Sequence, residues 1–133
     1  TKVCTLIREH MAHLNGVSLR NTRRLADRLG RDGLTVRMLS FLVEADHSGR
    51  PPLPGGMPES MQRILGYAQD LAILDARPQP LLLGRHLIAL GMTPGPHFKV
   101  LLNAAYEAQL DGLFGSEYGA LQWARRNKSI ILI

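Results

Sequence analysis

Two groups of residues have side chains and spacings suited to binding a phosphate. The first is the corner Pro94-Gly95-Pro96, which precedes a predicted helix from His97 to Leu110. Pro96 fits the start of a helix because its missing N–H would be unpaired there, and Gly95 lets another backbone or a ligand come close. Unpaired N–H groups of residues 97 to 99, the positive helix end and the ammonium group of Lys99 would then lie together. The alternative is that this corner only packs a short helix against a long one.

The second group is a row of arginines on a predicted helix that begins after Ser18 and ends at Gly30. At 100° per residue, these arginines fall within an arc of roughly 140°, and they are Arg20, Arg23, Arg24, Arg28 and Arg31. Only Asp27 interrupts this face. A solvated charged face is the alternative interpretation, but such faces usually mix signs. An excess of arginine suits the neutralisation of a nucleic-acid backbone, because guanidinium groups form paired hydrogen bonds with phosphate oxygens.

Composition is consistent with a globular nucleic-acid-binding protein. The 133 residues include 45% hydrophobic residues and carry a formal net charge of +5, which favours an acidic partner, nucleic acid before membrane. No long apolar run or signal peptide opens the chain, so a cytoplasmic protein is expected. Cys4 has no partner for a disulfide and is expected in the core. Because the first residue is Thr1 and the first residues already form a helical pattern, we expect a fragment of a longer protein.

Apolar residues recur at helical spacing along most of the chain, which predicts an all-α fold of six or seven helices with short joints. Residues 51–58 form a Pro/Gly-rich linker, because prolines prevent both a helix and a central strand there. We therefore expect a helical segment at 1–50 and a second helical region at 59–133.

The region from Pro80 to Gly112 contains an ordered set of residues that resembles a known family. It resembles the C-terminal RNA-binding region of bacterial tRNA nucleotidyltransferases (CCA-adding enzymes) and poly(A) polymerases. The similarity covers about a quarter of the chain and rests on Pro80, Gly84, Leu87, Ile88, Leu90, Gly91, Pro94, Gly95, Pro96, Phe98 and the run 107–112.

A second, shorter similarity lies near residue 50. The run Ala45 to Arg50 resembles the segment that closes the helical region of the same family related to HD phosphohydrolases. An HD metal site needs a His-Asp doublet with further ligands, whereas Asp46 here precedes His47 and stands alone. We therefore expect no metal site, and a structural role for Asp46, pairing with Arg50 or capping backbone groups.

The resemblance implies that catalysis and RNA binding take place in different parts of a longer enzyme. Nucleotidyl transfer of this type needs closely spaced carboxylates that hold two metal ions, and the chain contains no Asp-x-Asp. The resemblance therefore implies that a catalytic head lies upstream, where it would use Mg²⁺ and a nucleoside triphosphate, and that this piece holds RNA, above all tRNA. No catalytic residue and no cofactor are expected in this chain. The candidate RNA-binding residues are Arg20, Arg24, Arg28, Arg31, Gly84, Arg85, Gly95, Pro96, His97 and Lys99.

Three alternatives remain open. A helix, the corner after Met92 and a second helix are also similar to helix-hairpin-helix modules, which hold DNA backbones. The chain can also be a piece of an HD-type phosphohydrolase, or a helical domain whose role is purely structural.

Overall fold

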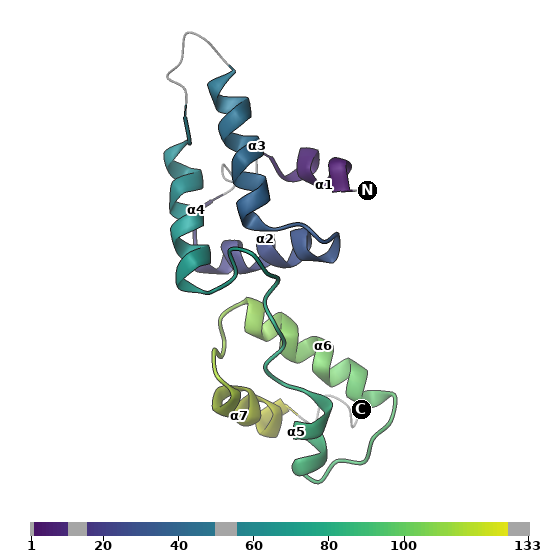
Figure 1. Ribbon diagram of the computed structural model, residues 1–133. Coiled ribbons are helices and arrows are strands. Elements are labelled where there is room, and N and C mark those ends of the chain that lie inside the picture. Colours follow the sequence, from purple (N-terminus) through teal and green to yellow (C-terminus); the bar gives the residue numbers. More distant parts are fainter. Residues whose placement is uncertain (1, 11–15, 50–55, 128–133) are drawn as a thin grey trace. The chain divides into compact units, whose positions relative to one another are not determined.

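The computed structural model describes residues 2–10, 16–49 and 56–127, and within these ranges it contains helices and no strand (Figure 1). This confirms the predicted all-α fold with six or seven helices. The helices are α1 (Lys2–Glu9), α2 (Leu19–Arg31), α3 (Val36–Ser48), α4 (Glu59–Asp70), α5 (Gly84–Ala89), α6 (His97–Leu110) and α7 (Glu117–Asn127).

The chain divides into two compact units, Thr1–Pro78 and Gln79–Ile133. The sequence analysis placed the division at 51–58, of which 51–55 lie outside the described residues. The difference arises from α4, which packs against α2 and α3 and so belongs to the first unit. Its apolar residues Met61, Ile64 and Ala68 are buried in the core of that unit. Hydrophobic contact therefore extends past the prolines and joins 59–78 to the residues before them.

In the first unit, α3 and α4 lie side by side and α2 runs across one end of the pair (Figure 1). The core includes Leu25 and Leu29 from α2 and Leu39 from α3. Two hydroxyl side chains cap helix starts, as short polar residues do at this position. Ser18 accepts a hydrogen bond from the N–H of Asn21 at 3.0 Å, and Thr35 accepts one from Met38 at 3.1 Å.

In the second unit, α5 and α7 both pack against α6. Its core includes Leu87, Leu101, Ala105 and Trp123, one or two residues from each helix. The segment that leads into α5 is held by Gln109. The Gln109 amide donates to the carbonyl of Gln79 at 2.8 Å and accepts from the N–H of Leu81 at 2.9 Å. Because α5 is too short to be stable alone, these contacts and the burial of Leu87 position it.

One expectation about burial is wrong. Cys4 is exposed and so is not a core residue. Within the described ranges, no helix combines the length and the apolar character that crossing a membrane requires.

Candidate nucleic-acid interface

A pocket of about 520 Å³ lies beside α2, and we call it the arginine pocket. Its described lining includes three arginines that follow one another at intervals of four residues, Arg20, Arg24 and Arg28. Residues four apart on a helix lie on the same face, so the local fold alone brings the three guanidinium groups to one side. Buried Leu25 and Ile64, together with Asn21, Thr22, Gly16 and Glu9, complete this lining.

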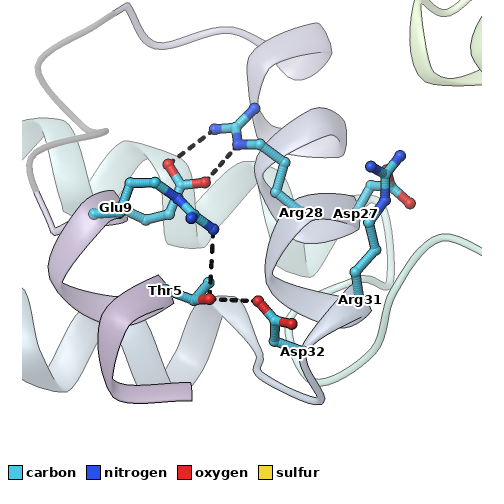
Figure 2. Close-up of polar contacts among 7 residues, drawn as sticks. Thr5, Glu9, Asp27, Arg28, Arg31 and Asp32 are labelled. Carbon is cyan, nitrogen blue, oxygen red and sulfur yellow. Dashed lines mark hydrogen bonds and ion pairs between the residues drawn. The ribbon is translucent and has the colours of Figure 1, made fainter. Parts of the chain in front are cut away.

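Glu9 of α1 holds the last of these arginines (Figure 2). The Nε of Arg28 donates to Oε2 of Glu9 at 2.5 Å, and its second nitrogen donates to Oε1 at 3.4 Å. The Glu9 side chain is 9% exposed, whereas that of Arg28 is 46% exposed. The hydroxyl of Thr5 donates to Asp32, just after α2, so two polar contacts join α1 to the C-terminal end of α2. Sequence analysis missed Glu9, because no spacing rule relates it to Arg28 nineteen residues later.

Asp27 does not interrupt the arginine face, because its side chain is buried. Its carboxylate is 3% exposed and pairs with Arg31 at 2.8 Å and with Arg77, beyond α4, at 2.7 Å. Arg31 is therefore an ion-pair partner of Asp27 and is not among the described residues of the pocket lining. Of the predicted row, three arginines thus line the pocket and Arg31 balances a buried carboxylate, while Arg23 is in neither described set.

The Pro94-Gly95-Pro96 corner, which we call the elbow, is partly occupied by its own chain. The Nε2 of His97 bonds to the carbonyl of Thr93 at 2.8 Å, which places the imidazole ring against Gly95. A Cβ atom on Gly95 would lie 2.8 Å from Cε1 of His97, so the glycine makes room for this ring. The N–H of Phe98, expected to be unpaired, donates to the carbonyl of Gly95 at 3.0 Å.

The outer side of the elbow is open to solvent. Pro94, Pro96 and Lys99 are exposed, and α6 begins directly after Pro96, as predicted. The elbow therefore presents one lysine and fewer unpaired amides than its sequence indicates, since the N–H of Phe98 is already paired.

Gly84 and Arg85 begin the short helix α5, where the structure shows a contact that the sequence analysis missed. Nδ1 of His86 accepts from the N–H of Leu83 at 2.9 Å, so the ring carries its hydrogen on Nε2, which donates to Glu117 at 2.8 Å. This hydrogen bond lowers the pKa of the Glu117 carboxyl, with a smaller effect from the nearby Arg85 guanidinium. The contact joins α5 to α7 across 31 residues, a separation at which periodicity gives no signal.

The residues that resemble the end of an HD region make local contacts. His47 Nδ1 bonds to the carbonyl of Gly56 at 3.0 Å, and the Ser48 hydroxyl accepts from the N–H of Gly56 at 2.8 Å. The predicted partner of Asp46, Arg50, lies outside the described residues. These contacts hold the residues on either side of the Pro/Gly-rich segment near one another.

The candidate RNA-binding residues thus fall into two sets, one in each unit of the chain. Arg20, Arg24 and Arg28 share one pocket in the first unit, and Gly84, Arg85, Gly95, Pro96, His97 and Lys99 lie in the second. No protein-family profile, no curated protein and no solved structure matches the chain.

Proposed function

We propose that this protein binds RNA through its phosphates and that the arginine pocket is the principal contact. The observation that carries the proposal is the alignment of Arg20, Arg24 and Arg28 along one pocket. Guanidinium groups present paired donors to phosphate oxygens, and phosphate contacts supply most of the affinity of a protein for a nucleic-acid backbone.

Charge supports the same interpretation. The chain carries a formal net charge of +5, and the one carboxylate within the arginine row, Asp27, is buried and paired. An anion that approaches the exposed side of α2 therefore meets arginine without a neighbouring exposed aspartate from the same helix. Such an arrangement favours binding that depends strongly on salt and weakly on base sequence.

The resemblance of 80–112 supports RNA, and tRNA in particular, as the nucleic acid. On this basis the protein is the RNA-holding part of a tRNA nucleotidyltransferase or poly(A) polymerase-like enzyme. A catalytic head elsewhere in the polypeptide would add nucleotides to the 3′ end, using Mg²⁺ and a nucleoside triphosphate. Duplex DNA binding, the helix-hairpin-helix alternative, is an outcome that the same experiment distinguishes.

The experiment compares the binding of three nucleic acids by fluorescence anisotropy over a series of salt concentrations. These are tRNA, tRNA that lacks its 3′ end, and duplex DNA. The expected order of affinity places both forms of tRNA above DNA, with a linear fall in log affinity against log salt concentration. Stronger binding of duplex DNA would replace the proposal with the DNA-binding alternative.

A pair of matched variants locates the contact. Arg20→Gln with Arg24→Gln removes two charges from the pocket, whereas Arg63→Gln with Arg125→Gln removes two from exposed positions outside its described lining. The first pair is expected to weaken tRNA binding and to flatten the salt slope by about 0.7 to 0.9 for each phosphate that the protein no longer neutralises. Equal effects from both pairs would mean that general charge, and not the pocket, attracts RNA.

A further inference from the structure

The outer face of α3 is exposed, and its middle is apolar. Met38 and Phe41 are 47% and 62% exposed, and Ala45 is exposed one turn after Phe41. At 100° per residue, these three side chains lie roughly opposite to Leu39 and Val43, which are buried in the core of the first unit. A helix face that meets only water is typically polar, so this face has the composition of a contact surface.

The same face follows the spacing of a coiled-coil seam. Met38, Phe41 and Ala45 are three and four residues apart, like the apolar a and d positions of a heptad. Arg37 and Glu44 are exposed and lie seven residues apart along one edge of this row, where heptads carry the charges that select a partner and its direction. We call these five residues the α3 seam.

The α3 seam is complementary to itself in the antiparallel direction. A two-fold axis beside Phe41 places each residue before Phe41 opposite one that follows it by about the same number of positions. Met38 then lies beside the smaller Ala45 of the second copy, and Arg37 lies beside Glu44 of the second copy. A parallel pair would instead place Met38 beside Met38, with no carboxylate beside Arg37.

Arg37 also has a partner within its own chain. Its Nε and one terminal nitrogen donate to Asp75 at 2.7 and 3.0 Å, and both side chains are exposed. A guanidinium has five N–H donors, so it can bind a second carboxylate. Because Asp75 already neutralises part of its charge, the contact with Glu44 mainly sets the direction of the pair. Phe41 and Met38 supply most of the affinity.

We infer that the α3 seam is a self-association surface, on which a second copy of this chain packs antiparallel with the two Phe41 rings at the centre. Two short helices bury less than the roughly 1,600 Å² of a standard interface, so the dimer is weak and forms with increasing concentration. None of the five seam residues is among the described lining of the arginine pocket. The inference therefore does not rest on the proposed RNA binding.

The first test measures the mass of the purified protein by analytical ultracentrifugation over a series of concentrations, without RNA. The average mass is expected to rise from that of a monomer toward that of a dimer. Phe41→Glu is expected to raise the dimer dissociation constant about tenfold or more, because it places two like charges at the centre of the pair. A monomeric mass at every concentration would overturn the inference.

Tyr118→Glu is the matched control, because Tyr118 is a 72% exposed aromatic residue on α7. It is expected to leave the dissociation constant unchanged, and circular dichroism checks that both variants keep their helices. An equal effect of Phe41→Glu and Tyr118→Glu would overturn the inference, because it would mean that added charge alone keeps the chains apart.

The charged edge of the seam has its own pair of variants. Glu44→Arg places two arginines beside one another twice in each dimer and is expected to weaken the dimer about threefold or more. Asp70→Arg makes the same change at an exposed position on α4 and should have no such effect. Equal dissociation constants for the two variants would contradict the antiparallel arrangement.

Disulfide cross-linking tests the direction of the pair. Met38→Cys and Ala45→Cys are made separately with Cys4→Ser, since Cys4 is exposed, and are oxidised alone and as a mixture. In the antiparallel pair, the two copies of either position are about 9 Å or more apart along the helix axis, beyond the roughly 7 Å between Cα atoms that a disulfide spans. The mixture is therefore expected to form a linked dimer and each protein alone is not. Linkage of each protein alone, or no linkage in the mixture, would overturn the inference.

Discussion

The buried carboxylate of Asp27, in the middle of α2, accepts a hydrogen bond from Nε of Arg77 at 2.7 Å, fifty residues later in the chain. The same carboxylate pairs with Arg31 one turn further along α2. Asp27 therefore joins the segment that follows α4 to the helix that carries the arginine pocket. A buried charge is tolerated only with such partners, because its desolvation is otherwise unfavourable.

Replacing Asp27 with asparagine is expected to destabilise the first unit. The change removes two charge-assisted contacts, but both arginine partners are substantially exposed and regain water, so the expected loss is about 1–3 kcal/mol in the free energy of unfolding. Urea denaturation followed by circular dichroism measures this loss. Asp75→Asn is the matched control, because Asp75 pairs with Arg37 at an exposed site. A larger effect of the control than of Asp27→Asn would contradict the structural role of Asp27.

Gly30 lies where Arg77 crosses α2. A Cβ atom on Gly30 would be 2.5 Å from Cβ and 2.9 Å from Cγ of Arg77, so an added methyl group must displace the arginine. Gly30→Ala is therefore expected to lower the free energy of unfolding by about 1–3 kcal/mol, although alanine is the better helix former. A lower midpoint temperature of thermal unfolding in Gly30→Ala than in the unmodified protein would show this loss of stability.

Gly66 on α4 supplies the control for Gly30. No atom lies within 4 Å of a Cβ built at Gly66, and the residue is helical. Gly66→Ala is expected to stabilise the protein by about 0.4–1 kcal/mol, since it only reduces the freedom of the unfolded chain. Stabilisation by both substitutions would mean that Arg77 does not pass against Gly30.

The pH dependence of the second unit is expected to include a contribution from Glu117. The hydrogen bond from His86 lowers the pKa of Glu117 in the folded state below its ordinary value of 4.5. Between the two pKa values the unfolded state therefore binds more protons. The contribution to stability is fully present above about pH 4.5 and is lost as pH falls through the lower folded pKa.

Trp123 is buried in the core of the second unit, so its fluorescence can follow the unfolding of that unit. The difference in unfolding free energy between the unmodified protein and Glu117→Gln is expected to be constant near neutral pH and to shrink in the acid range. A difference that does not shrink below about pH 4.5 would contradict this contribution of Glu117.

Helical periodicity and capping residues predicted local structure well, because both depend on near neighbours. The bounds of α6 and the start of α2 directly after Ser18 agree with the sequence analysis. Helical periodicity also predicted that the arginines lie on one face of α2. What the sequence left open was which arginines face a pocket, since that depends on Glu9 and Arg77 from distant segments.

The structure places α4 in the first unit, whereas the sequence analysis placed it in the second region. This assignment also depends on residues that are far apart in the chain. Prolines in 51–58 indicate an interruption of secondary structure, but they do not determine which core the following helix joins. Burial of Met61 and Ile64 against residues of α2 and α3 decides that question, and it depends on long-range packing.

Two substitutions that each remove one charge compare how much the arginine pocket and the elbow contribute to tRNA affinity. Arg24→Gln removes one charge from the arginine pocket, and Lys99→Gln removes one from the elbow. The Phe98 amide of the elbow already donates to an internal hydrogen bond, and the His97 ring lies against Gly95. We expect Arg24→Gln to reduce tRNA affinity about tenfold and Lys99→Gln less than about threefold.

The measurement is tRNA binding by fluorescence anisotropy at two salt concentrations, with circular dichroism to show that both variants keep their helices. Because the substitutions change the net charge equally, a general electrostatic effect would lower both affinities alike. A greater reduction with Lys99→Gln would place the main phosphate contact at the elbow, where one exposed lysine would then act with the remaining amides of the first turn of α6. The expected result instead assigns it to α2, where three guanidinium groups recur on successive turns and an approaching phosphate can bond to two of them at once.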